Sequence, residues 1–228
     1  MDHENSMEAA KTRILQAALP HAAFDGWSQT TLNATLTDSD IAPALARALF
    51  PRGGIDLAVA YHQAGDQAMR DALASTDLTA LRYTDRVAAA IKLRLAAADK
   101  ELVRRGTTLF SLPQHAPEGA KLIWASADAI WQALGDTSTD LNWYTKRATL
   151  SAVYSATVLF WLGDHSDDNA DTWAFLDRRL ANVTKFEKTK AAIQANPLAK
   201  ALLAGPAKLL EKIRAPKAAA DLPGHHKP

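Results

Sequence analysis

The sequence predicts an all-α protein, and three observations support this fold class. Apolar residues recur with helical periodicity in nearly every segment. Alanine and leucine are abundant, whereas the alternation of β-branched residues that is typical of strands is scarce. Proline, glycine and aspartate turns separate the helical stretches, and no repeat of fixed period indicates a solenoid. The expected helices span residues 7–23, 28–36, 43–50, 56–73, 78–105, 118–134, 141–162 and 170–186.

The first four helices are bounded by start and stop signals. Pro20 is expected to kink or shorten the last turn of the first helix. Ser28 can cap the second helix, and Pro43 suits the first turn of the third. Asp56 lies in the first turn of the fourth helix. These signals predict a front module of four helices.

Four further helices form the predicted body. Residues 78–105 are expected to form one long helix. Pro113 and Pro117 bracket a loop before the next helix, and a polar break at residues 164–168 precedes the last one. Three acidic residues of the long helix are expected to be solvated charges: Asp85, Asp99 and Glu101.

The segment of residues 187–214 is amphipathic and basic. From Lys185 to Lys217 there are eight basic and two acidic residues, a net charge of +6, while the rest of the chain carries −5. This asymmetry favours contact with an anionic membrane surface, and the alternative is packing on the body or between subunits. The apolar residues expected to contact the membrane are Leu198, Leu202, Leu203, Leu209, Leu210 and Ile213.

The composition is typical of a globular protein with a hydrophobic core. A chain of 228 residues with 48% hydrophobic residues can bury a core and is too apolar to be disordered. No apolar run approaches the ~18 residues of a membrane span. Residues 1–13 resemble neither a secretory signal nor a transit peptide, so a soluble cytoplasmic protein is expected.

The sequence favours a protein that is not an enzyme. The absence of cysteine excludes disulfides, thiolate zinc sites and cysteine nucleophiles. No two histidines have metal-ligand spacing, and no phosphate-binding loop, dinucleotide fingerprint or nucleophile elbow is present. The cluster of Asp164, His165, Asp167 and Asp168 is more typical of helix caps and turns than of metal ligands. No catalytic residue, metal site or cofactor is predicted.

The front helices resemble the TetR-type helix-turn-helix, with residues 44–51 in the place of its recognition helix. A helix that reads DNA needs side chains that reach phosphates and base edges. This segment offers Arg47 alone, and Asp38 and Asp40 place negative charge before it. We therefore expect DNA binding to be lost, with Arg47 and Arg52 solvated or stabilising turns.

A run of eleven residues, STDLNWYTKRA at positions 138–148, resembles the most distinctive stretch of the coenzyme Q biosynthesis protein nine family. The resemblance continues through Val153 and Tyr154, the run DTWAFL at 171–176 and the turn FDGW at 24–27. The resemblance covers roughly residues 10 to 190. The chain looks like a bacterial member of this family. We expect the chain to lack the mitochondrial targeting extension of eukaryotic members, in keeping with a bacterial protein.

The resemblance implies a TetR/FadR-like helical bundle with a degenerate helix-turn-helix and a C-terminal amphipathic helix. It divides the chain into a flexible N-terminus (1–8), a helix-turn-helix-like module (9–75), a lipid-binding and dimerisation body (76–186), the membrane-contact helix (187–214) and a flexible tail (215–228). It also implies a homodimer that holds a lipid or isoprenoid quinone intermediate. The partner would be the di-iron demethoxyubiquinone hydroxylase, which the protein would contact at the inner membrane.

The resemblance assigns two sets of site residues. The expected partner-binding patch contains Ile130, Asp140, Trp143 and Tyr144. The expected lipid-pocket residues are Trp124, Trp131, Tyr154 and Trp161.

Two alternatives stay open at the level of sequence. Asp140 could simply cap a helix, and periodicity places Trp143 on one helical face with Leu150, Tyr154 and Trp161, which favours the core. For the whole chain, the alternative to a lipid-presenting accessory protein is a TetR-type, lipid-responsive transcriptional regulator.

Overall fold

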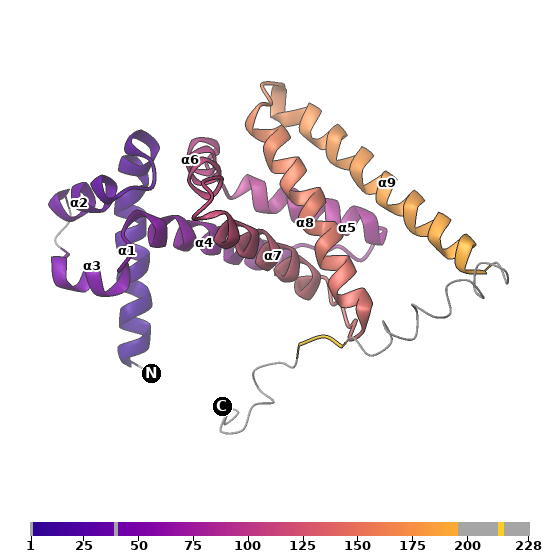
Figure 1. Cartoon of the computed structure of the whole chain (residues 1–228), viewed down its shortest axis with the longest axis horizontal. Helices are drawn as coiled ribbons and strands as arrows, with labels where there is room; N and C mark the ends of the chain where they lie inside the picture. The colour runs from indigo at the N-terminus through magenta and orange to yellow at the C-terminus, as the bar shows by residue number, and fades with distance from the viewer. Residues whose placement is uncertain (1, 39–40, 196–213, 217–228) are drawn as a thin grey trace.

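The computed structural model describes residues 2–38, 41–195 and 214–216, and within these ranges it contains helices and no strand (Figure 1). The prediction of an all-α fold is confirmed. The helices are α1 (Asp2–Asp25), α2 (Gln29–Asp38), α3 (Pro43–Leu49), α4 (Gly54–Ala74), α5 (Tyr83–Ala96), α6 (Lys100–Phe110), α7 (Ala116–Ala133), α8 (Leu141–Leu162), the 3₁₀ turn η1 (Asp167–Asn169) and α9 (Ala170–Ala195).

Two hydrophobic clusters divide the molecule. The front cluster joins α1 to α4 and includes Ile14, Leu32 and Leu57, and it also takes in Leu102 of α6. The body cluster joins α5, α7, α8 and α9. Figure 1 shows α1, α2 and α3 at one end of the molecule and α9 at the other.

Helix α4 belongs to both clusters. Its first half buries Leu57 and Ala58 in the front cluster, and its second half buries Met69 and Leu73 in the body cluster. It also packs along α7, one of the central helices of the body. Because one continuous helix joins both cores, α4 holds the front module in place against the body.

The prediction of a single helix over residues 78–105 is wrong. Helix α5 ends at Ala96, and α6 begins at Lys100. Asp99 separates them: its Oδ1 accepts a hydrogen bond from Leu102 N at 2.9 Å, while its own backbone N–H donates to the Tyr61 hydroxyl at 2.8 Å. Asp99 is therefore an N-cap that redirects the chain rather than a charge inside a helix, although it is exposed as expected.

The other helices lie close to their expected positions. Ser28 caps α2 as predicted, since its Oγ accepts a hydrogen bond from Thr31 N at 3.2 Å. The helix predicted at residues 141–162 is found over the same span. Pro20 does not shorten α1, which continues to Asp25, and α9 continues nine residues beyond the predicted end at residue 186.

Candidate functional site

A cavity with a volume of about 530 Å³, called the larger cavity below, lies between α5, α7, α8 and α9. Its lining is mostly apolar and includes Val87, Leu150 and Val153. Thr149 of α8 and Lys188 of α9 line it as well. A cavity of this size is within the ~300–1,000 Å³ typical of small-molecule sites.

Trp131 lines the larger cavity, and its indole N–H is buried and unpaired within the described ranges. The side chain is 8% exposed, and its indole Nε1 has no hydrogen-bond partner among the residues that the structure describes. Tyr83 stacks against the ring at 5.6 Å, and Lys146 Nζ lies 5.7 Å from the ring centroid. A buried N–H without an acceptor costs about 1–3 kcal/mol.

Lys146 and Arg147 hold the start of α8 against the end of α7. Lys146 Nζ donates to Asp136 Oδ1 at 2.7 Å and to Ser138 Oγ at 2.8 Å, and Arg147 Nη1 donates to Asp136 Oδ2 at 3.2 Å. Burial by itself would raise the pKa of Asp136, but the hydrogen bonds from Lys146, Ser138 and Arg147 lower that pKa to about 2. Asp136 is therefore ionised and fixes both cations at neutral pH.

Three residues of the predicted partner patch lie together at the start of α8. Asp140 is exposed and caps the helix, with its Oδ1 accepting from Asn142 N at 2.9 Å. Trp143 is half-buried: the Arg147 guanidinium lies 4.0 Å from its ring centroid, and Tyr144 contacts it edge-on at 4.7 Å. Trp124 of α7 lies 6.0 Å from the same ring. Asp140 and Trp143 therefore each combine a structural role with partial exposure.

The fourth predicted patch residue, Ile130, does not belong to this surface. It is 0% exposed and lies in the body cluster. A side chain that neighbouring helices cover completely cannot contact a partner in this conformation, so Ile130 is corrected to a core residue.

Residues 214–216 lie beside the patch. The Tyr144 hydroxyl donates to Arg214 O at 3.2 Å, and Ala215 N donates to Thr139 O at 2.9 Å. The C-terminal part of the chain therefore returns to the start of α8. The predicted membrane-contact residues, from Leu198 to Ile213, lie outside the described residues.

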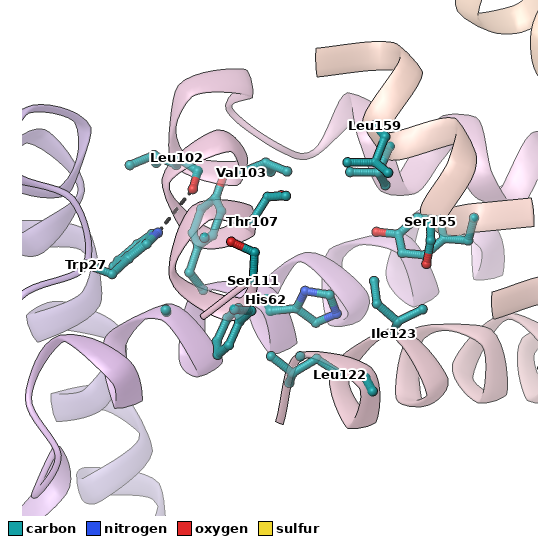
Figure 2. Close-up of a pocket in the computed structure, with 18 of the residues that line it drawn as sticks. Trp27, His62, Leu102, Val103, Thr107, Ser111, Leu122, Ile123, Ser155 and Leu159 are labelled. Carbon is teal, nitrogen blue, oxygen red and sulfur yellow. Dashed lines mark hydrogen bonds between the residues drawn. The ribbon is translucent and has the colours of Figure 1, made fainter. Parts of the chain in front are cut away.

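The smaller cavity lies between the front module and the body and has a volume of about 290 Å³ (Figure 2). Trp27 closes one side, with its Nε1 donating to Leu102 O at 3.1 Å. The remaining lining comes from α4 to α8 and is largely apolar. Figure 2 shows His62 of α4 near Ser111, which follows α6, and Leu122 of α7.

A buried polar network forms one end of the smaller cavity. Arg94 Nε donates to Asp66 Oδ1 at 2.6 Å, and Arg94 Nη2 donates to His62 O at 3.0 Å. Ser126 donates to Asp66 Oδ1 at 2.8 Å, and its Oγ lies 2.7 Å from His62 Nε2. Burial lowers the pKa of His62 to about 4, a direction that Arg94 reinforces and Asp66 opposes. His62 is therefore neutral at neutral pH.

The sequence analysis did not single out this network. His62 and Asp66 are four residues apart on one helix, and that spacing was the available signal. Arg94 and Ser126 come from two other helices, so no local pattern joins them to the pair.

The four predicted pocket residues are distributed over different places. Trp131 lines the larger cavity, and Tyr154 lines the smaller one. Trp124 and Trp161 line neither of these two cavities. Trp124 packs near Trp143, and Trp161 is buried with Lys100 Nζ 5.2 Å from its ring centroid.

The acidic loop before α9 is a capping structure. Asp164 accepts hydrogen bonds from Ser166 N at 2.8 Å and from Thr172 N at 2.9 Å. Hydrogen bonds from the Ser166 and Thr172 side chains and backbone lower the pKa of Asp164 below its usual range. Among the described ranges no group of three or more His, Asp or Glu side chains could hold a metal ion.

In the front module, Arg52 lies in the turn before α4 and forms two ion pairs. Arg52 Nη2 lies 2.6 Å from Asp56 Oδ1 and 2.9 Å from Glu118 Oε1, so it connects the start of α4 to α7. Arg47 lies in the last turn of α3 and is exposed. In the part of the chain that the structure covers, no helix is long and apolar enough to cross a membrane.

Comparison with known proteins gives a family and a fold. Residues 116–187 match the family model described as COQ9, which corresponds to coenzyme Q biosynthesis protein nine. The chain is 32% identical over 203 residues to the human mitochondrial ubiquinone biosynthesis protein COQ9, covering 85% of this chain and 63% of that protein. It is 32% identical over 185 residues to the corresponding protein of Xenopus tropicalis, covering 77% and 58%. The chain thus spans about three fifths of the length of these relatives.

A solved structure supports the architecture. The TetR transcriptional regulator from Nitrosomonas europaea superposes with a TM-score of 0.60 at 20% identity, covering 76% of this chain and 97% of that one. This likeness confirms the predicted TetR-like fold.

Proposed function

The chain is a homologue of the COQ9 proteins and carries the COQ9 family domain, and on this premise we propose that it is a non-enzymatic accessory protein of ubiquinone biosynthesis. It binds an isoprenoid quinone precursor and presents it at the inner membrane to the di-iron hydroxylase that acts on demethoxyubiquinone. The named relatives are ubiquinone biosynthesis proteins, which supports the pathway.

One observation carries the proposal: the larger cavity and the partner patch share the first turns of α8. Asn142, Thr145 and Lys146 line the cavity, while Trp143 and Tyr144 between them form the patch. A lipid held in the cavity is therefore adjacent to the surface where a partner would dock. The cavity is mainly apolar, which suits the isoprenoid part of a quinone precursor.

A carrier has a physical purpose in this pathway. Exposing each methylene of an isoprenoid tail to water costs about 0.8 kcal/mol, so the precursor leaves a bilayer only into another apolar environment. The basic, leucine-rich segment that precedes Arg214 supplies the proposed membrane contact. Truncation after Ala195 tests it: loss of binding to anionic liposomes is expected, and unchanged binding would assign the membrane contact elsewhere.

The first test measures quinones in cells. Deleting the gene should lower ubiquinone and accumulate demethoxyubiquinone, both quantified by mass spectrometry. Unchanged quinone levels would exclude a role at this step.

The patch is tested by complementation of the deletion strain. Trp143→Leu is preferable to lysine, because the Arg147 guanidinium lies 4.0 Å from the Trp143 ring centroid and would repel a second cation placed there. It should fail to restore ubiquinone while the purified protein stays helical by circular dichroism. Phe24→Leu is the matched control, since Phe24 is 86% exposed on the front module, and it should complement fully. Equal complementation by both variants would remove Trp143 from the partner surface.

A second candidate function is that of a lipid-responsive transcriptional regulator. The likeness to a TetR regulator supports it, while the composition of α3, with Arg47 as its one basic residue, opposes it. Salt-dependent DNA binding by the purified protein would favour the regulator.

A further inference from the structure

The proton positions in the buried network of the smaller cavity can be assigned from three side chains. Ser126 is 0% exposed, and its Oγ lies 2.8 and 3.0 Å from the two carboxylate oxygens of Asp66. A carboxylate that is paired with Arg94 only accepts hydrogen bonds, so the single hydroxyl hydrogen of Ser126 goes to Asp66. His62 Nε2 must then be the donor in its 2.7 Å contact with Ser126 Oγ.

This arrangement fixes the tautomer of His62. A neutral imidazole with its proton on Nε2 has a bare Nδ1, which is a hydrogen-bond acceptor. His62 lines the smaller cavity, the backbone carbonyl of Leu122 is a further acceptor for its ring N–H, and no contact found among the described residues has a donor to Nδ1. The cavity therefore contains a fixed acceptor at its polar end.

The polar end carries no net charge. Arg94 and Asp66 form an ion pair of 2.6 Å in which the two side chains are 4% and 6% exposed. His62 is neutral beside them. An anionic or cationic headgroup would find no unpaired counter-charge here, and burying an unpaired charge is costly. The site suits a neutral ligand.

A hydroxyl group fits this end better than a carbonyl does. Tyr61 also lines the cavity, and its oxygen accepts the Asp99 N–H at 2.8 Å, which leaves its own O–H to donate. A ligand hydroxyl can donate to His62 and accept from a neighbour, whereas a quinone oxygen only accepts. With a quinone, Nδ1 would stay buried and unpaired, at a cost of about 1–3 kcal/mol or roughly tenfold in affinity.

We propose that the smaller cavity is a separate site for a neutral phenol with a short apolar substituent, whose O–H is donated to His62 Nδ1. The volume of about 290 Å³ accommodates a ring and a short chain rather than a long isoprenoid tail. This inference does not depend on the proposed function, which uses the larger cavity.

The test compares three probes of equal chain length by isothermal titration calorimetry with the full-length protein carrying Thr149→Phe, a substitution that fills the larger cavity. They are para-hexylphenol, hexyl-para-benzoquinone and para-hexylbenzoate. The phenol should bind at least about tenfold more tightly than the other two, because it alone supplies a neutral donor. Equal or tighter binding of the quinone or the benzoate overturns the proposal, and so does the absence of phenol binding.

Two matched substitutions show which of the two cavities binds the phenol. Thr107 lines the smaller cavity and Thr149 lines the larger one, so Thr107→Phe and Thr149→Phe make the same change in each. Thr107→Phe should abolish phenol binding, and Thr149→Phe should leave it unchanged. Loss of phenol binding only in Thr149→Phe would overturn the assignment. Ubiquinone levels in cells should fall with Thr149→Phe and stay unchanged with Thr107→Phe. Failure of the phenol proposal is therefore distinguishable from failure of the proposed function.

The role of His62 is tested by His62→Phe, which removes the acceptor and keeps a ring. The preference for phenol over quinone should fall from about tenfold to about equal affinity. If this variant does not fold, His62→Gln supplies an amide oxygen as acceptor and should keep part of the preference. A full preference in His62→Phe would remove His62 from the site.

Discussion

At position 65, the lack of a side chain makes room for the buried guanidinium of Arg94. A Cβ there would lie 2.4 Å from Arg94 Nη1 and 2.5 Å from its Cζ. Hydrogen bonds to Asp66 and to His62 O hold the guanidinium, so it cannot move without losing them. Although alanine is the better helix former, we expect Gly65→Ala to lower the free energy of unfolding by about 1–3 kcal/mol.

Gly106→Ala is the control for this prediction. Gly106 also lies within a helix, but a Cβ there would make an ordinary contact, 3.6 Å from Trp27 Nε1. Gly106→Ala should leave stability unchanged or raise it by up to about 1 kcal/mol. Urea unfolding followed by circular dichroism measures both variants. Equal effects would mean that Arg94 does not limit the space at position 65.

Because the pKa of the buried His62 is lowered, we expect the protein to lose stability in mild acid. Burial holds its folded pKa near 4, below the ordinary value of 6.5. Between these values the unfolded chain binds a proton that the folded chain does not, so the free energy of unfolding falls as the pH falls. The loss would reach about 3 kcal/mol at the lower end of this window. It should be seen in urea titrations at stepped pH.

The control for this prediction is His62→Gln, which cannot titrate. Its stability should change much less than that of the wild type as the pH falls from 6.5 to 4. Asp136 acts in a separate window: its folded pKa of about 2 lies below its ordinary 3.8, so its contribution is lost only as the pH falls below 3.8. Identical profiles for wild type and His62→Gln above this second window would contradict the assignment.

Individual residues were predictable where one local pattern decides the outcome. Asp140 immediately precedes a helix, and the structure shows the cap that this position favours. Ile130 could not be placed by its helix alone, because whether a position is covered depends on which neighbours pack on it. The network of His62, Asp66, Ser126 and Arg94 joins three helices, and no local spacing encodes such a meeting.

At the scale of helices, Asp99 is the residue that divides a predicted helix into two. Asp99→Ala should lower the free energy of unfolding by about 1 kcal/mol, because Leu102 N would lose its capping acceptor. Thermal unfolding followed by circular dichroism measures the effect. Asp85→Ala is the matched control: Asp85 makes an exposed pair with Arg82 and should cost less than about 0.5 kcal/mol. A larger effect at Asp85 would contradict the capping role of Asp99.

Two stretches of the chain, α8 and residues 78–105, show when helix boundaries can be predicted. Helix α8 has an aspartate cap before it and a glycine after it, and the predicted and observed spans agree. Residues 78–105 contain Asp99 after a run of alanines, and an aspartate in that context is compatible with either a continuous helix or a new cap. The hydroxyl of Tyr61, a residue far away in the sequence, contacts the break and favours the cap.

At the scale of the whole molecule, an apolar face on α8 and α9 predicts self-association. Leu159 is 61% exposed, and Phe160 is 37% exposed and stacks on Phe175 with ring centroids 4.6 Å apart. We expect the wild type to be a dimer and Phe160→Lys to be a monomer in size-exclusion chromatography with light scattering. Leu112→Lys, at a position 42% exposed on another part of the surface, should stay dimeric. A monomeric wild type would exclude this interface.

The fold as a whole could be predicted because helical periodicity and the resemblance at residues 138–148 gave the same answer. The cavities could not be predicted, since apolar residues on helices look alike whether they fill a core or border a space. Trp131 and Trp161 illustrate this: both are buried aromatic residues of the body, and one lines the larger cavity while the other packs in the cluster.

The placement of tryptophans makes the two cavities separately observable. Within the described residues, the smaller cavity is lined by one tryptophan, Trp27, and the larger by one, Trp131. If both indoles carry a fluorine label, each contributes its own resonance to a single NMR spectrum. Phenol should then shift the Trp27 signal and a quinone lipid the Trp131 signal, so that the occupancy of both cavities can be followed in one sample.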